Sequence, residues 1–577
     1  MLRLEGDIMS FLTELLENAD NPEEFKALID RNPHLKMYLE EFIDKTGSIP
    51  KYLSKLSREL RGLRMPNIIY LAGEPIFIHI YSISEDRRPI YHPVEPRIPG
   101  INYKLIEIVE EALAYVIDDK YDYSSAKEHE ELIKRALRET VSIDNSILNL
   151  GEFRIKEDRY GYKKIFVNKL TYDCLEYFLI REKVGLGVLE PFIRDSYIED
   201  ITCNGLGPLF VEHKIFHSLE TTVKFESEEE LDEFIIKLSE RIGRPVAYRR
   251  PIVDAVLPDG SRINIVFGKD ISQKGSNFTI RKFSEIPLSI IQLCLWNTMS
   301  FLEAAYLWML LENGLSVWIC GETASGKTTT LKAITTFIDP NAKIISIEDT
   351  PEVVVPHENW TREVTRESED KSASVQMYDL LRAALRQRPN YIIVGEIRGI
   401  EGSVAFQAMQ TGHPVMATFH AASVEKLIQR LTGSPIEIPK TYIDNLNAVV
   451  IQSAVRLPKT GRLERRVISI NEIIGYDPVD EQFHFIELFT WDPATDRHEF
   501  RGEGMSYLLE NKIARMKGIP ERKIRKIYEE LFMREEILRL LGEMGVTNYY
   551  DVWEVIKKSR IIGLEKMLEI LRGGKLP

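Results

Sequence analysis

The stretch that decides the fold is Leu315–Thr330, LSVWICGETASGKTTT. It begins with the largely apolar run LSVWIC, which is typical of a buried strand in a parallel sheet. The loop Gly321–Gly326 follows, and Lys327 and Thr328 then open a helical segment. This is the spacing Gly-x4-Gly-Lys-Ser/Thr in its strand–loop–helix setting. Backbone N–H groups of such a loop curl around phosphate oxygens, and the helix N-terminus adds favourable partial charge. The stretch therefore predicts an α/β fold with a nucleotide site.

The side chains of this loop have roles that follow from their chemistry. Lys327 is expected to reach the β- and γ-phosphates, and the Thr328 hydroxyl is expected to ligate Mg²⁺. The full set of expected nucleotide-binding residues is Gly321, Thr323, Ala324, Ser325, Gly326, Lys327, Thr328 and Thr329.

Two further strand ends carry acidic residues. Strand YIIV at 391–394 ends in Gly395-Glu396, where many P-loop enzymes place Asp-Glu. Glycine cannot ligate a metal, so we expect Glu396 to act on Mg²⁺ through water. The strand at 344–347 ends in Glu348, also at a carboxyl end where such sheets bind ligands. A general base must lie within reach of the attacking water. The sequence leaves open which glutamate does so, and ordinary capping or solvated carboxylates are the alternative.

Two histidines bracket the strand VMATF at 415–419, His413 before it and His420 after it. An imidazole there could sense the γ-phosphate or relay a conformational change, or it could be a satisfied core residue. Metal ligation is disfavoured because no further cluster of His, Cys or carboxylates has ligand spacing. The four cysteines form no CxxC pair, so no zinc is expected.

Composition sets the broad class of protein. Of 577 residues, 44% are hydrophobic and 28% charged, which argues against disorder and against a disulfide scaffold. The net charge of −14 argues against bulk nucleic-acid binding. Neither a secretory signal nor a run of about 20 apolar residues is present. We therefore expect a cytoplasmic protein whose membrane role, if any, is peripheral.

The sequence pattern differs between regions of the chain. From about 286, strand-like and helix-like segments alternate, which predicts a parallel sheet wound with helices. The boundaries we expect are 1–60 for a helical segment, 61–185 and 186–285 for two α+β subdomains, and 286–577 for the P-loop domain with a helical C-terminal region.

Four motifs together resemble a known family. The succession GETASGKTTT, SIEDTPE, LRQRPNYIIVGEIRG and TGHPVMATFHA is similar to the secretion ATPase superfamily of type II and type IV secretion, pilus-assembly and archaellum motors. The segments PNIIYLAGEPIFIHIY, SYIEDITCNG, LPDGSRINI and FTIRKF resemble the N-terminal half of its archaeal branch. The tetracysteine zinc module of the bacterial type II branch is missing, which also favours the archaeal branch.

The resemblance implies a RecA-like C-terminal motor domain, a mobile α+β N-terminal domain whose second part is PAS-like, a homo-hexameric ring, and the use of ATP with Mg²⁺. Glu348 then matches the family's acidic-box glutamate, Glu396 its metal-side glutamate, and His413 and His420 its histidine box. Family members also bring arginines from the N-terminal domain to the γ-phosphate. The matching candidates are Arg241, Arg262 and Arg281, each of which could equally be a surface salt-bridge partner.

The function implied is an ATP-hydrolysing motor that powers assembly of an archaellum or archaeal type IV pilus-like filament. Its implied partners are a polytopic membrane platform protein and cytosolic accessory subunits, at the inner face of the cell membrane. Protein secretion or DNA translocation by the same superfamily and a non-hydrolysing ring scaffold are the alternatives. Nucleic acid is not the first choice of partner.

Overall fold

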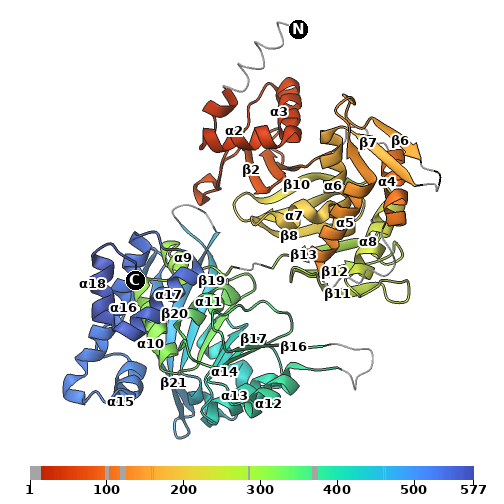
Figure 1. Cartoon of the computed structure of the whole chain (residues 1–577). Coiled ribbons are helices and arrows are strands. Elements are labelled where there is room, and N and C mark those ends of the chain that lie inside the picture. The colour runs from red at the N-terminus through yellow and green to blue at the C-terminus, as the bar shows by residue number, and fades with distance from the viewer. Residues whose placement is uncertain are drawn as a thin grey trace. The chain divides into compact units, whose positions relative to one another are not determined.

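The computed structural model describes residues 14–97, 103–116, 125–157, 159, 162–283, 286–366, 374–458, 461 and 463–576. The chain divides into two compact units, Met1–Phe283 and Ser284–Pro577, which are described here one at a time (Figure 1). Within the described ranges, no helix is both long and apolar enough to cross a membrane.

The C-terminal unit is built on a nine-stranded sheet in the order β16-β15-β17-β18-β14-β19-β20-β21-β22. Strands β16 through β19 pair in parallel, and β20 to β22 extend the sheet as antiparallel strands. The strands are β14 Val317–Gly321, β15 Ile344–Glu348, β16 Trp360–Val364, β17 Tyr391–Ile397, β18 Val415–Phe419, β19 Ala448–Arg456, β20 Leu463–Asp477, β21 Gln482–Asp492 and β22 Arg497–Phe500. This sheet confirms the predicted α/β class and the RecA-like motor fold.

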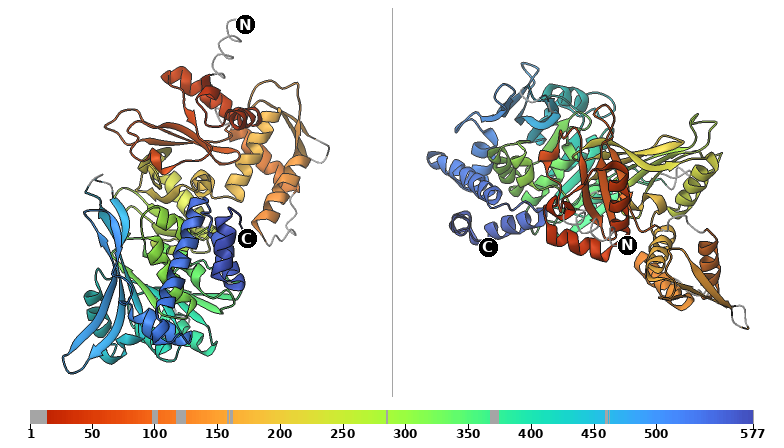
Figure 2. Two further views of the ribbon diagram at one scale, coloured as in Figure 1. Left: turned by 90° about the vertical axis from the view of Figure 1, so that its left-hand side faces the viewer. Right: turned by 90° about the horizontal axis from the view of Figure 1, so that it is seen from above.

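Both faces of the parallel strands are covered (Figures 1 and 2). In β14, Val317 and Ile319 join one apolar core, and Trp318 and Cys320 join the other. This explains why the strand reads as apolar throughout, since each face packs against helices. The helices are α9 Ile290–Leu295, α10 Phe301–Glu312, α11 Lys327–Ile334, α12 Met377–Arg386, α13 Glu401–Gln410, α14 Val424–Thr432, α15 Ala514–Met516, α16 Arg525–Glu543, α17 Tyr549–Ile562 and α18 Leu564–Arg572, with a π-helix over Leu508–Ile513.

The helical C-terminal region is tied to the sheet by a buried carboxylate. Glu472 of β20 is fully buried and accepts hydrogen bonds from the Tyr306 hydroxyl at 2.7 Å, the Ser506 hydroxyl at 2.5 Å and the Leu508 amide at 3.1 Å. Burial raises the pKa of Glu472, although these three donors oppose the shift. The network holds α10 and the chain after residue 500 against the antiparallel part of the sheet.

The N-terminal unit contains a ten-stranded sheet in the order β1-β2-β3-β4-β10-β9-β8-β13-β12-β11. One face carries α2 and α3, and the other carries α7 and α8. These elements are α2 Pro22–Arg31, α3 Pro33–Thr46, α7 Glu190–Arg194, α8 Glu228–Arg241, β1 Lys51–Tyr52, β2 Asn67–Gly73, β3 Ile76–Tyr81, β4 Ile90–Val94, β8 Ile198–Cys203, β9 Gly207–His213, β10 His217–Phe225, β11 Ile252–Val256, β12 Arg262–Val266 and β13 Asn277–Arg281.

This large sheet runs across the boundary expected between residues 185 and 186, because β4 pairs in parallel with β10. The elements that lie between β4 and α7 along the chain form a smaller body with its own apolar core and a three-stranded sheet, β5-β7-β6. Its elements are α4 Tyr103–Val116, α5 Ala126–Thr140, α6 Lys169–Lys183, β5 Val141–Ile143, β6 Phe153–Glu157 and β7 Lys163–Val167. The strands on either side of this insertion join through long-range pairing, which local sequence patterns do not encode.

Candidate nucleotide-binding and catalytic site

The candidate site lies at the carboxyl edge of the parallel strands in the C-terminal unit. The strand order places the ends of β15, β17, β18 and β14 side by side along this edge. From one end to the other, this edge carries Glu348 at the end of β15, Gly395-Glu396 near the end of β17, His420 after β18 and the loop that starts at Gly321. Residues that are far apart in sequence thus meet at one edge, as the parallel arrangement requires.

The loop after β14 has the backbone shape of a phosphate cradle. Ala324 and Gly326 adopt positive φ angles of 62° and 93°, and α11 begins directly afterwards at Lys327. A side chain at Gly321 would overlap the carbonyl oxygen of Gln452, so the loop requires glycine at that position. A Cβ at Gly326 would lie 3.0 Å from Nε2 of the same glutamine. These constraints account for both glycines of the motif.

The lysine of the motif is buried within the loop. Lys327 is 7% exposed, and its ammonium group donates to the carbonyl of Glu322 at 2.8 Å. Burial lowers the pKa of Lys327, and the nearby Glu396 opposes that shift. The Ser325 hydroxyl donates to the same carbonyl at 2.8 Å. Thr328 follows in the first turn of α11 and is partly exposed.

Two residues that the sequence analysis did not single out support the loop from its other side. Gln452 of β19 accepts a hydrogen bond from the Thr330 hydroxyl at 2.8 Å, and Arg465 of β20 donates from Nε to the carbonyl of Ala324 at 3.1 Å. A glutamine inside the apolar run AVVIQSAV was the one sequence signal that could have indicated the first contact. Arg465 has no comparable signal, because antiparallel pairing of β20 with β19 brings it to the loop.

Strand β17 is interrupted at the site by a bulge. Val394 pairs with Ala417 and Ile397 with Phe419, so Gly395 and Glu396 together face the single residue Thr418. The Thr418 hydroxyl donates to the carbonyl of Gly395 at 2.6 Å. Bulges redirect side chains next to active sites, and this one sets the direction of Glu396.

The glycine at position 395 has a steric reason. A Cβ there would lie 3.1 Å from Cγ of Glu348, which extends over it from the neighbouring strand β15. Glu348 is 2% exposed, and its Oε1 accepts the amides of Glu352 at 2.9 Å and Val353 at 2.7 Å. Arg362 approaches its Oε2 at 3.4 Å. Burial raises the pKa of Glu348, and the two amides oppose the shift.

Glu396 contacts a histidine and an arginine. Its Oε1 lies 2.6 Å from Nε2 of His420, and its Oε2 lies 2.5 Å from the guanidinium of Arg398. Burial lowers the pKa of His420, as does the charge of Lys327, and Glu396 opposes both. His420, Glu396 and Lys327 therefore act on one another electrostatically.

The structure separates the two histidines of the predicted pair. His413 precedes β18 and thus lies at the amino edge of the sheet, where its Nδ1 is 3.1 Å from the Thr411 hydroxyl. His420 follows the same strand and lies at the carboxyl edge. The five-residue strand β18 separates them. Of the two histidines, therefore, only His420 lies at the candidate site.

The candidate arginines belong to the N-terminal unit. Arg262 of β12 lies directly opposite Arg281 of β13, and Arg281 in turn lies opposite Asp200 of β8. Like charges placed directly across two strands repel each other. Asp200, opposite Arg281, offsets part of this charge.

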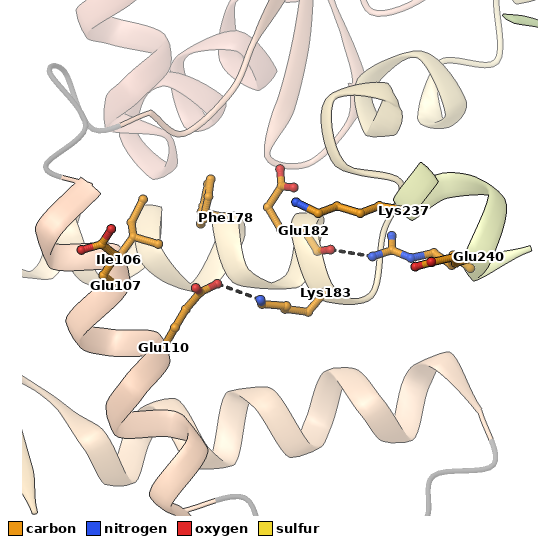
Figure 3. A pocket seen from close by; sticks show the side chains of 9 residues that line it. Ile106, Glu107, Glu110, Phe178, Glu182, Lys183, Lys237 and Glu240 are labelled. Atoms are coloured by element: carbon orange, nitrogen blue, oxygen red, sulfur yellow. Dashed lines mark hydrogen bonds and ion pairs between the residues drawn. The ribbon is translucent and has the colours of Figure 1, made fainter. Parts of the chain in front are cut away.

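Arg241 has a different setting, at the end of α8. Its guanidinium donates to the backbone carbonyls of Glu182, at 2.7 Å, and Gly185. It lines a cavity of about 520 Å³ that also includes Glu110 and Lys183, which form an ion pair of 2.8 Å (Figure 3). Arg241 thus caps the C-terminal end of α6 by binding its backbone carbonyls, which is a structural role.

Mg²⁺ fits the residues at the carboxyl edge by their chemistry. The Thr328 hydroxyl and the Glu396 carboxylate offer the hard oxygen donors that Mg²⁺ prefers, with water and phosphate oxygens completing its shell. Over the described part of the chain, no group of three or more His, Cys, Asp and Glu residues is arranged to hold a metal ion.

The chain is similar to several known proteins. The family described as type II/IV secretion system protein matches residues 182–494. An uncharacterized protein of Methanocaldococcus jannaschii is 46% identical over 543 residues, which cover 94% of this chain and 98% of that protein. Protein VirB11 of Agrobacterium fabrum is 28% identical over 301 residues, covering 46% of this chain and 86% of that protein. The X-ray structure of the ATPase DotB of Legionella pneumophila shares 20% identity, with a TM-score of 0.35, over 62% of this chain and 91% of that chain.

The family match includes the phosphate-binding loop, both glutamates and His420, and the archaeal relative extends the likeness to nearly the whole chain. The chain belongs to the type II/IV secretion system protein family.

Proposed function

We propose that this chain is an ATP-hydrolysing motor. The observation that carries the proposal is the meeting of the phosphate loop with two glutamates at one edge of the sheet, beside His420. Lys327 and the loop amides would bind the β- and γ-phosphates, and Thr328 with Glu396 would hold hydrated Mg²⁺, which supplies charge neutralisation at the phosphates.

Within this site we assign the general base to Glu348. Its pKa is raised by burial, which makes its carboxylate a better proton acceptor than an exposed glutamate. In the reaction, the oxygen of a water molecule bonds to the γ-phosphorus while the bond to the β–γ bridging oxygen breaks. The proton of that water passes to Glu348, and ADP leaves with the bridging oxygen. Two backbone amides hold Glu348 in place during these steps.

Three variants test the assignment in a binding assay and a turnover assay. Lys327→Ala should abolish binding of a fluorescent ATP analogue. Glu348→Gln should keep that binding and its dependence on Mg²⁺ but lose turnover. Glu396→Gln should also lose turnover, and in addition the benefit of Mg²⁺ to binding should shrink. Wild-type turnover in Glu348→Gln would contradict its role as base.

We further propose that the motor acts as a homo-hexameric ring at the inner face of the cell membrane. ATP binding would close the N-terminal unit over the motor unit, with Arg262 and Arg281 as the arginines that reach phosphate. Release of the products would reopen it and move a polytopic membrane partner. Support for this assignment is the match of Arg262 and Arg281 to the family's N-terminal arginines, whereas the backbone contacts of Arg241 favour a structural role for that residue.

The work done by the motor is assembly of a surface filament, an archaellum or a type IV pilus-like fibre. Its support is the resemblance of the motifs to the archaeal branch, together with the extensive likeness to an archaeal protein. Protein secretion through a membrane machine is the second candidate. Its support is that 221 residues of this chain are 29% identical to the type IV secretion system protein VirB11 of Bartonella quintana.

Replacing Glu348 by Gln at the native locus distinguishes these functions. Loss of swimming together with its filament, seen by electron microscopy, would indicate an archaellum motor. Loss of thin pili with intact swimming would indicate pilus assembly. If both filaments persisted while secreted proteins disappeared from the medium, secretion would replace filament assembly as the function.

A further inference from the structure

Arg398 follows the bulge of β17 and has a side chain that reaches back to the site. Its guanidinium contacts Oε2 of Glu396 at 2.5 Å. The other oxygen of this carboxylate faces His420. Arg398 and His420 therefore both occupy the carboxylate on which a hydrated metal ion would depend.

The backbone under Arg398 is fixed, whereas its side chain is not enclosed. The amides of Arg398 and Gly399 both donate to Oε1 of Glu401, at 2.6 and 2.7 Å, at the start of α13. The side chain of Arg398 is 68% exposed and that of Glu396 is 21% exposed. The guanidinium can consequently leave Glu396 by side-chain rotation alone, while its Cα stays at the edge of the site.

An arginine and a hydrated metal ion need the same lone pairs of a carboxylate, so they compete. We propose that Arg398 is a positioning residue that competes with hydrated Mg²⁺ for Glu396 and, once displaced, turns to the terminal phosphate of the bound nucleotide. This inference rests on the proposed ATPase function and deepens it by naming the exchange that couples metal binding to phosphate binding.

The charges around the site favour this exchange. Arg398 acts electrostatically on Lys327 as a like charge, so Lys327 repels it once Glu396 is engaged elsewhere. A triphosphate brings negative charge to the same place and gives the planar guanidinium a partner that it can bind through two N–H groups.

The test measures binding rather than turnover. A fluorescent ATP analogue is titrated into the full-length protein at a series of Mg²⁺ concentrations, and the half-saturating Mg²⁺ concentration is recorded. Arg398→Ala should lower that concentration about fivefold, as expected for removing a competing, partly exposed ion pair. The same variant should weaken binding of the ATP analogue more than binding of the matching ADP analogue.

Two further variants make the result decisive. Arg398→Lys keeps the charge but loses the planar fork, so its half-saturating Mg²⁺ concentration should lie between those of wild type and Arg398→Ala. Arg382→Ala, an exposed arginine on α12, should behave as wild type. If Arg398→Ala fails to fold, the lysine variant alone decides, and an unchanged Mg²⁺ requirement would overturn the inference.

Failure of the inference can be told apart from failure of the proposed function. A wild-type protein that binds no nucleotide would refute the ATPase proposal itself. A wild-type protein that binds nucleotide with Mg²⁺, and an Arg398→Ala variant with the same Mg²⁺ requirement, would refute only the role of Arg398.

Discussion

The contact between Gly395 and Glu348 leads to the sharpest prediction, because a single methyl group should impair catalysis without touching the nucleotide. In Gly395→Ala the new Cβ would lie 3.1 Å from Cγ and 3.5 Å from Cβ of Glu348, where ordinary contacts begin near 3.4 Å. Glu348 must then shift by a few tenths of an ångström. Its carboxylate is held by two amides at 2.7 and 2.9 Å, so the shift also strains these hydrogen bonds.

The size of the effect follows from the sensitivity of catalysis to position. A misplacement of about 1 Å can cost about 100-fold in rate, so a few tenths of an ångström should lower kcat about threefold to tenfold. The affinity for a fluorescent ATP analogue should stay within about twofold, because the phosphate loop lies on another strand. Steady-state phosphate release and equilibrium fluorescence measure the two quantities separately.

Two companion variants control the experiment. Gly433→Ala creates an equally tight contact, 3.1 Å from the carbonyl of Gln429, but at the end of α14, so it should leave kcat unchanged. Gly395→Asp would place a second carboxylate beside Glu348 and should reduce turnover more than alanine does. A normal kcat in Gly395→Ala, or a gain in turnover in Gly395→Asp, would refute the reasoning.

Three other outcomes are expected. Turnover should fall as the pH is lowered through the raised pKa of Glu348, because a general base must be ionised to accept a proton. A kcat that stays constant from neutral pH down to pH 4.5 would contradict this role. Arg465→Ala should raise the nucleotide Kd about fivefold with little change in kcat, because one hydrogen bond to the carbonyl of Ala324 is lost. Isothermal calorimetry would measure the Kd. An unchanged Kd would show that this contact does not support the loop. Glu472→Ala should lower the free energy of unfolding of the C-terminal unit by about 3 to 5 kcal/mol, because the Tyr306 hydroxyl and two other buried donors lose their acceptor. Urea unfolding would measure this free energy. A loss below about 1 kcal/mol would contradict a stabilising role of the network.

Much of the motor site could be predicted from the sequence because its determinants are local. The loop from Gly321 to Thr328 is one continuous segment whose glycines, lysine and threonine fix its conformation and chemistry. The ends of the strands could also be recognised, so Glu348, Glu396 and His420 were expected near the loop. The parallel sheet then brings them to one edge without further information.

The remaining features depend on pairing between distant segments. The bulge that directs Glu396 exists because of the register of β17 against β18, and the need for glycine at 395 arises from a side chain on β15. The support of the loop by Arg465 requires an antiparallel strand that the sequence analysis did not identify. Similarly, the ten-stranded N-terminal sheet joins segments on both sides of an inserted body.

By itself, then, the sequence determined the phosphate loop, the α/β class and the acidic strand ends, since neighbours along the chain specify these. Only the tertiary structure decided that His413 and His420 lie at opposite edges, that Arg241 caps a helix while Arg262 faces Arg281, and that Arg398 holds Glu396. The physical reason is that strand register and side-chain packing are settled by contacts between residues far apart in the chain, and these contacts leave no periodic pattern in the sequence.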